Sequence, residues 1–266
     1  MATSAVSARV VNRWHCPSEK PMLTVVMRSL SALALAAVLL CPLAAEAGVV
    51  IAGTRLVYPA QEREVTLGLN NEAQRPSLVQ LWIDDGNQDT PPEEAKAPFV
   101  MTPPLLRMDA GARQAVRIRF TGPAQPGDRE SLYWVNVLEI PPSSAAEDKL
   151  DLAFRSRIKL FYRPAGLPGE AGTAHRQLRW SLQQRAGGLA VQVDNPTPWH
   201  VSFAAISLTV DGKVSADTGG GMVAPRATQV FPLDGLATRP QGVIGIEYST
   251  ITDVGAVQPA SASLAN

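Results

Sequence analysis

Cysteine is almost absent from this sequence. Only Cys16 and Cys41 occur among the 266 residues, and both lie within the first 47. The rest of the chain therefore has no disulfide, no thiolate metal site and no cysteine nucleophile. Histidine is nearly as scarce there, with only His175 and His200. A surface or partly packed position is the simplest interpretation of each, because a metal site usually needs three or four ligands.

Long apolar runs are also missing, apart from one near the start. Residues 30–43 form an apolar stretch that follows Arg28 and precedes the small-residue sequence AEA at 45–47. This order is typical of a secretory signal peptide cleaved after residue 47, and the run is too short for an ordinary membrane span. We expect residues 1–47 to comprise an upstream extension and a signal peptide, and the remaining 219 residues to be exported.

No strong charge of either sign remains after this cleavage. Residues 1–47 hold four of the 24 basic and two of the 24 acidic residues, which leaves 20 and 22. This balance indicates neither a nucleic-acid nor a membrane-surface partner. The chain also lacks a G-x-S-x-G elbow, a phosphate-binding glycine loop before a helix and an H-E-x-x-H motif. We therefore expect no enzymatic activity, no metal and no cofactor.

Sustained helical periodicity is missing too, whereas strand signals are frequent. Short segments that alternate apolar and polar residues, separated by proline, glycine or aspartate, predict an antiparallel β-sandwich. In the first half these segments are EVTLGLNN (64–71), SLVQLWID (77–84), QAVRIRFTG (114–122), SLYWVNVLEIPP (131–142) and KLDLAFRSRIKLFYRP (149–164).

A change of composition at residues 163–177, where proline, glycine and alanine replace the strand pattern, predicts a domain boundary. Strand signals resume beyond it in LRWSLQQ (178–184), LAVQVDN (189–195), HVSFAAISLTV (200–210), TQVFPL (228–233) and GVIGIEYST (242–250). We expect an all-β protein with an N-terminal domain at 48–165 and a C-terminal β-sandwich at 166–266.

Several basic residues lie inside these predicted strands. Arg117 and Arg119 share one face of their strand and fit its solvent side. Arg157 and Lys159 share a face in the same way, so periodicity alone favours solvent for both. A lysine in the middle of a half-buried strand nevertheless needs an explanation.

Four motifs together resemble a known family. GTRLVYP (53–59), RESLYWVNVLEIPP (129–142), IKLFYRP (158–164) and NPTPW (195–199) are similar, in order and spacing, to the periplasmic chaperones of the chaperone-usher pathway that assemble pili. The likeness covers essentially the whole chain after residue 47. It implies two immunoglobulin-like domains set at an angle with a cleft between them. It also implies an ATP-independent chaperone in the periplasm, with pilus subunits and an outer-membrane usher as partners.

The resemblance also implies roles for individual residues. Arg55 and Lys159 match the basic pair that holds the C-terminal carboxylate of a pilus subunit, a group that accepts bonds from guanidinium and ammonium. A second set matches the family's interdomain salt bridges: Glu130, Arg163 and Asp253. A third set matches the strand lent to the subunit, a form of β-augmentation for which pilin donor-strand complementation is itself a standard example: Leu150, Leu152 and Phe154.

Alternatives remain open from the sequence. The three apolar side chains of the lent strand could instead pack into this protein's own core, and an exposed apolar edge could lead the free protein to self-associate. The protein could itself be a pilus subunit or adhesin, although such subunits typically carry a cysteine pair and an N-terminal donor extension. The short loop PPSSAAEDK at 141–149 resembles the short-loop subgroup, which is associated with rod-like pili.

Overall fold

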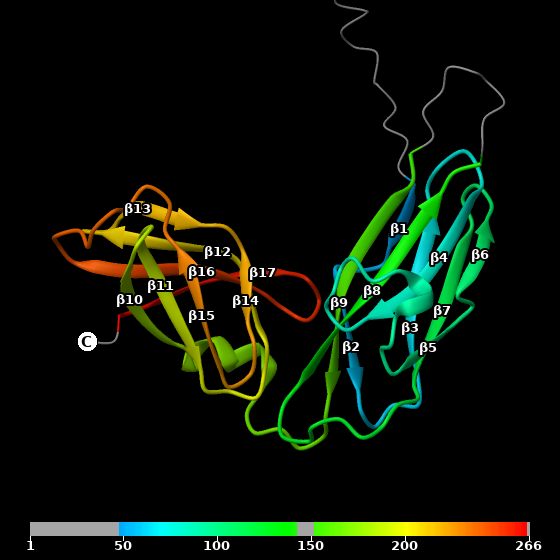
Figure 1. Cartoon of the computed structure of the whole chain (residues 1–266), viewed down its shortest axis with the longest axis horizontal. Helices are drawn as coiled ribbons and strands as arrows, with labels where there is room; N and C mark the ends of the chain where they lie inside the picture. Colours follow the sequence, from blue (N-terminus) through cyan, green and yellow to red (C-terminus); the bar gives the residue numbers. More distant parts are fainter. Residues whose placement is uncertain (1–47, 143–151, 265–266) are drawn as a thin grey trace, which may run out of the picture. The chain divides into compact units, whose positions relative to one another are not determined.

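The computed structural model describes residues 48–142 and 152–264. In these ranges the chain forms seventeen strands, β1 to β17, and two short 3-10 helices, η1 (Pro92–Glu94) and η2 (Ala171–Gln177) (Figure 1). Two separate hydrophobic clusters define two β-sandwiches, which belong to one compact unit of the chain, Glu46–Asn266. The prediction of an all-β protein with two sandwich domains is confirmed.

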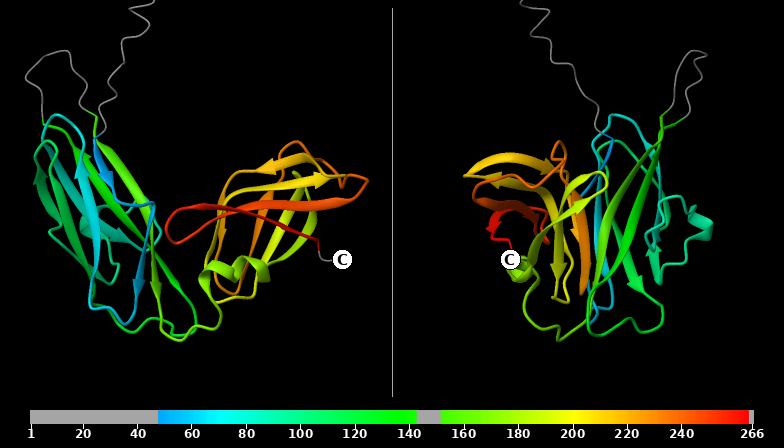
Figure 2. Two further views of the ribbon diagram at one scale, coloured as in Figure 1. Left: turned by 180° about the vertical axis from the view of Figure 1, so that it is seen from behind. Right: turned by 60° about the vertical axis from the view of Figure 1, so that its left-hand side comes forward.

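The first sandwich consists of two sheets, seen from two further directions in Figure 2. One has the strand order β1-β3-β7-β5, and the other, here called the β9 sheet, has the order β2-β9-β8-β4-β6. The strands are β1 (Val49–Ile51), β2 (Arg55–Pro59), β3 (Val65–Asn71), β4 (Ser77–Asp84), β5 (Phe99–Thr102), β6 (Leu105–Met108), β7 (Arg113–Phe120), β8 (Ser131–Ile140) and β9 (Phe154–Arg163).

Alternation along these strands builds the first core. Leu67 and Leu69 of β3 are buried, as the sequence pattern predicted. Val116 and Ile118 of β7 are buried as well, whereas Arg117 between them is exposed. Residues two apart in a strand point to the same face, so these apolar positions meet the β9 sheet while the intervening ones meet solvent.

The second sandwich begins after η2. One sheet has the order β10-β11-β15, and the other has the order β13-β12-β16-β17 with β14 paired to β12. The strands are β10 (Arg179–Arg185), β11 (Gly188–Asn195), β12 (Val201–Val210), β13 (Lys213–Thr218), β14 (Gly221–Val223), β15 (Ala227–Pro232), β16 (Ile244–Ile251) and β17 (Val257–Ala262). Its core contains Trp180, Phe203 and Tyr248, whose rings contact one another.

Strand β9 has different neighbours along its two edges. On one edge it pairs antiparallel with β8 from Phe154 to Tyr162. On the other edge it pairs parallel with β2 only from Lys159 to Arg163. Within the described ranges, residues 154–158, here called the open half of β9, therefore have a strand partner on one side only.

Three details differ from the expectations. The strand predicted at 149–164 begins at Phe154, because Leu152 and Ala153 precede it outside any strand, and residues 143–151 lie outside the described part. The segment 163–177 is not entirely irregular, since η2 forms at its end. His175 in η2 is buried, and its Nδ1 lies 3.1 Å from the Tyr248 hydroxyl, so it is neither a surface residue nor only partly packed.

Candidate functional site

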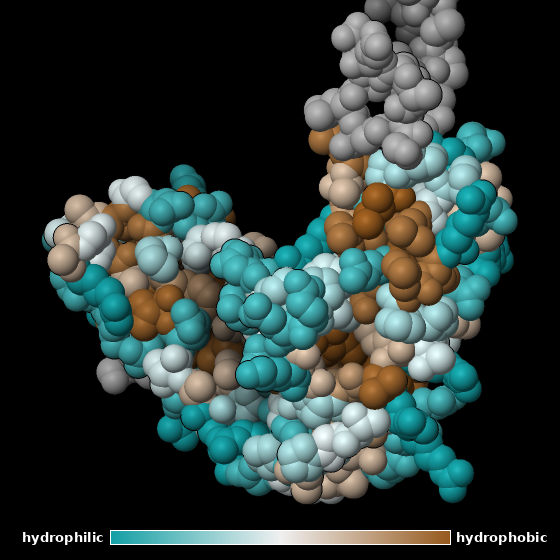
Figure 3. Space-filling model, turned by 45° about the vertical axis from the view of Figure 1, so that its right-hand side comes forward, coloured by the Kyte–Doolittle hydropathy of each residue, from teal (hydrophilic) through white to brown (hydrophobic). Residues whose placement is uncertain are grey.

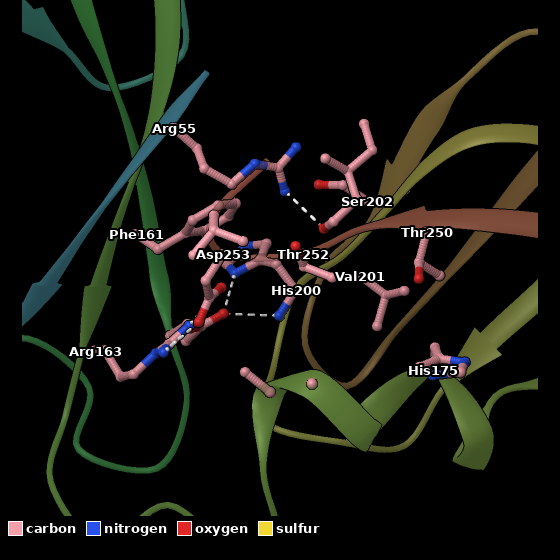
Figure 4. A pocket seen from close by; sticks show the side chains of 15 residues that line it. Arg55, Phe161, Arg163, His175, His200, Val201, Ser202, Thr250, Thr252 and Asp253 are labelled. Atoms are coloured by element: carbon pink, nitrogen blue, oxygen red, sulfur yellow. Dashed lines mark hydrogen bonds and ion pairs between the residues drawn. The ribbon is translucent and has the colours of Figure 1, made fainter. Parts of the chain in front are cut away.

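A pocket of about 220 Å³ is lined by residues of both sandwiches. Figure 4 shows its side chains converging from β2 and β9 of the first sandwich and from the second. Arg55 of β2 and Arg163 of β9 line it, together with Glu130. From the second sandwich it is lined by Ser202 and Asp253, among others. Four of the residues singled out in the sequence therefore lie around one space.

Arg55 and Lys159 are brought together by the parallel pairing of β2 with β9, in which they are direct register partners. The Nη1 atom of Arg55 donates a hydrogen bond of 2.9 Å to the carbonyl oxygen of Ile251. The Nζ atom of Lys159 donates one of 3.1 Å to the hydroxyl of Ser202, a residue of the pocket wall. Neither member of this basic pair forms an ion pair with a carboxylate among the described residues.

The electrostatics of this basic pair favour an anion. Burial and the neighbouring charge of Arg55 lower the pKa of Lys159 to about 8. Burial also lowers the pKa of Arg55, although Asp253 opposes the shift, and the Nε atom of Arg55 is buried with no hydrogen-bond partner. Two partly desolvated cations beside a free donor make this a place where a carboxylate would be stabilised.

A network of charges joins the two sandwiches at the other side of the pocket. Arg163 donates from Nε to Glu130 at 2.8 Å and, through its two Nη atoms, to Asp253 at 2.8 and 3.1 Å. Burial lowers the pKa of Arg163, but the bonds from Asp253 and Glu130 outweigh it and raise the pKa overall. The Glu130 side chain is only 2% exposed, so its charge depends on these partners.

His200 completes this network and was not singled out for it in the sequence. Its backbone N–H donates to Oε2 of Glu130 at 2.8 Å, and its ring Nδ1 lies 3.2 Å from the same oxygen. The side chain is 5% exposed while the residue as a whole is partly buried, which agrees with the partly packed position expected from the sequence. Its place directly after NPTPW is the only signal that the sequence offered.

Apolar side chains lead from the open half of β9 away from the basic pair. Leu152 is 52% exposed and Phe154 is 62% exposed, so both project from the first sandwich instead of filling its core. Figure 3 shows apolar side chains gathered on the surface of this sandwich. Leu150, the third member expected, lies outside the described residues.

Arg157 differs from its predicted solvent position. Its guanidinium bonds Asp84, a carboxylate with no exposed surface at the end of β4. No local pattern connects these residues, because they are 73 positions apart and meet only through the register of β4, β8 and β9.

Across 48–142 and 152–264, no three His, Cys, Asp or Glu side chains are grouped closely enough to hold a metal ion. The helices in the same ranges are too short and too polar to cross a membrane.

Comparison with known proteins agrees with the fold. Residues 48–168 match the model described as "Pili and flagellar-assembly chaperone, PapD N-terminal domain", and residues 173–262 match "Pili assembly chaperone PapD, C-terminal domain". The chain is 40% identical over 248 residues to the chaperone protein FimB/FhaD of Bordetella pertussis, covering 90% of this chain and 98% of that one.

Solved structures give the same result. The CupB2 chaperone of Pseudomonas aeruginosa has a TM-score of 0.70 and 40% identity, over 81% of this chain and all of that one. The SafB chaperone of Salmonella enterica, solved in complex with the SafA pilin, has a TM-score of 0.67 and 32% identity, over 82% and 96% of the two chains. This chain belongs to the PapD-like pilus-assembly chaperones of the chaperone-usher pathway.

Proposed function

We propose that this protein is a periplasmic, ATP-independent and non-enzymatic chaperone that binds pilus subunits by donor-strand complementation and delivers them to an outer-membrane usher. The single observation behind this is β9: among the described residues its open half has no strand neighbour on one edge, it begins with the exposed Phe154, and it is followed by Lys159 beside Arg55. SafB, a relative of similar architecture, was solved with a pilin bound to it.

The open half would serve as the missing strand of a subunit. Unpaired N–H and C=O groups along an edge bind an extended segment of another chain through main-chain hydrogen bonds, and side chains of one parity fill its pockets. Phe154 and Leu152 would enter the subunit's groove, with Leu150 preceding them. Since Leu152 and Phe154 are already about half covered, each would contribute about 1 to 2 kcal/mol on full burial.

The basic pair would hold the subunit's C-terminal carboxylate. Arg55 would offer its guanidinium group, and Lys159 would exchange its bond with Ser202 for the carboxylate. A hydrogen bond to a charged group contributes about 1.5 to 3 kcal/mol net. The pair would therefore set the register of the subunit strand, because a slip of one residue would turn every inserted side chain away from the groove.

Two further roles complete the proposal. The charge network of Glu130, Arg163, Asp253 and His200 would hold the two sandwiches so that the basic pair faces the subunit.

An exposed apolar edge also favours self-association of the free protein. The short loop at 141–149, part of which lies outside the described residues, would place the protein among chaperones of rod-like pili.

Co-expression with the pilin genes nearest to this gene, followed by pull-down, tests the proposal. Arg55→Ala and Lys159→Ala should each leave the protein folded but reduce subunit recovery at least tenfold, because the carboxylate loses a charged partner. Arg117→Ala, an exposed arginine on β7, is the matched control and should recover subunits normally. Equal recovery by both pocket variants and the control would refute the carboxylate-binding role, and recovery of no pilin by the unchanged protein would refute the chaperone function.

A further inference from the structure

The outer face of the β9 sheet, the face away from its core, contains a buried carboxylate that the proposed site does not use. Asp84 is fully buried there. It accepts hydrogen bonds from Arg157 Nε at 3.1 Å, from Asn136 Nδ2 at 2.7 Å and from the backbone N–H of Gly86 at 2.8 Å. Burial raises the pKa of Asp84, but the bonds from Arg157, Asn136 and Gly86 outweigh this and lower it overall. The carboxylate is therefore held charged by three elements at once.

Asn136 extends these contacts along β9. It is fully buried, and its Oδ1 accepts from Nε and Nη2 of Arg155 at 3.0 and 2.7 Å. Arg155 also donates from Nη1 to the carbonyl of Gln88 at 2.7 Å. A buried amide with both ends occupied thus joins Asp84 of β4 to Arg155 of β9, and Asp84 itself bonds Arg157, the next outward-facing residue of β9.

Two tryptophans cover the same face. The Arg155 guanidinium carbon lies 4.9 Å from the centre of the Trp82 ring, and that of Arg157 lies 4.2 Å from the centre of the Trp134 ring. Lys159 Nζ lies over the same Trp134 ring at 5.8 Å. The three cations spaced two apart on β9 are thus each seated on an aromatic surface, which favours one rotamer for each.

The contacts of Asp84 and Asn136 with β9 fall in its open half, which has no strand partner on one edge among the described residues. Arg155 and Arg157 both lie in the open half, whereas pairing with β2 starts at Lys159. An edge segment with a partner on one side only is where a strand frays most easily. The side chains of Arg155 and Arg157 reach back over β8 and β4 and attach the open half to the sheet from its paired edge.

We propose that Asp84, Asn136 and Arg157 are positioning residues that keep the open half of β9 extended in the free chaperone, ready to pair with a subunit strand. This inference rests on the proposed function. A segment that is already in its bound conformation loses less freedom on binding. If the open half were ordered only a tenth of the time, the apparent affinity would fall about tenfold.

Hydrogen exchange of the free protein, measured without any subunit, tests whether these residues keep the open half of β9 extended. The double variant Asp84→Asn with Arg157→Met removes both charges, so no buried charge is left unpaired. Exchange of those amides in 154–158 that bond β8 should speed up at least tenfold, with 159–163 unchanged. Arg117→Met is the control and should change neither segment. Should the double variant not fold, Asn136→Ala, which keeps the ion pair, takes its place. Unchanged exchange in a folded variant overturns the proposal.

The rates of pilin binding test whether the extended open half is ready to pair with a subunit strand. The probe is the pilin that the unchanged protein recovers. Loss of preorganisation should slow association about tenfold and leave dissociation of the formed complex within about twofold, because the subunit strand then orders β9 itself. Unchanged association despite faster exchange would overturn the positioning role. If no pilin is recovered at all, the chaperone function fails, while the exchange experiment still decides whether the network orders the open half.

Discussion

Among the individual residues, Lys159 is a cation that lies partly buried beside another cation. Its ammonium is partly buried beside the guanidinium of Arg55, and among the described residues its hydrogen-bond partner is a hydroxyl, not a carboxylate. Burial of a charge without an opposite charge is unfavourable, and the lowered pKa measures that penalty. An arriving carboxylate would relieve it, so the strain in the free protein becomes binding free energy in the complex.

This leads to a prediction about pH. A bound carboxylate should raise the pKa of Lys159 from about 8 toward or above the ordinary value of 10.5. Below pH 7 the lysine is charged in both states and affinity should not vary through this group. Above pH 8 the free lysine loses its proton while the bound one keeps it, so affinity should fall as pH rises.

Calorimetry at pH 8.5 in two buffers of different ionisation enthalpy should therefore show uptake of protons on binding. Lys159→Arg is the matched control, since arginine stays charged throughout this range and should show no uptake. Absence of proton uptake by the unchanged protein would contradict the assignment of Lys159 to the carboxylate.

At the level of elements, β9 combines regions of different exposure. Ile158 and Leu160 are buried in the first core, whereas Phe154 on the same side of the strand is exposed. The strand thus extends beyond the sandwich that it helps to build. Ser156 separates the exposed Phe154 from the buried Ile158 on this face, so one face of the strand serves the protein's own core at one end and is exposed at the other.

Leu152→Asp should therefore weaken subunit capture about tenfold while leaving the free protein as stable as before, because the lost contact is with the subunit. Val214→Asp, at another exposed apolar position on β13, is the control and should not affect capture. Thermal unfolding and titration with the recovered pilin measure the two effects. A clear loss of stability of the free protein would show that Leu152 packs into its own domain.

For the whole molecule, the contacts of Arg163 connect the two sandwiches. Its two acidic partners differ in exposure: Glu130 is almost fully buried, whereas the Asp253 side chain is 44% exposed. Removing a partner from a buried charge is far more costly than removing one from an exposed charge. The bond of Arg163 to Glu130 therefore contributes more to the stability of the protein than its bonds to Asp253.

Arg163→Met should lower the free energy of unfolding by roughly 3 kcal/mol, because Glu130 is left buried with only His200 beside it. Asp253→Asn should cost less than about 1 kcal/mol. Urea denaturation of both variants measures the difference. Equal losses would show that burial of Glu130 does not dominate the network.

Much of this architecture could be predicted from the sequence, for reasons that differ from residue to residue. Alternation identified Leu67 and Leu69 as core residues because their strand has one buried face. Alternation alone placed Lys159 in solvent, since a pattern cannot distinguish open solvent from a pocket, and only the resemblance assigned it a partner.

The features that could not be predicted from the sequence depend on how neighbouring strands are aligned. Asn136 and Arg157 are register partners, whereas Asp84 pairs with Trp134 and meets them diagonally across the sheet, which no local pattern reveals. His175 is buried through a 3-10 helix inside a segment whose composition indicated only a linker. The start of β9 at Phe154 likewise follows from where β8 ends its pairing.

The parallel pairing of β2 with β9 has a consequence for the length of the bound chain. Position 159 of β9 is already occupied on that edge by Arg55, so a guest segment lying along 154–158 can extend no further. A guest whose carboxylate meets the basic pair must run in the same direction as β9 and must end there. β2 would therefore act as a stop for such a guest, and would distinguish a true chain terminus from an internal stretch of the same sequence.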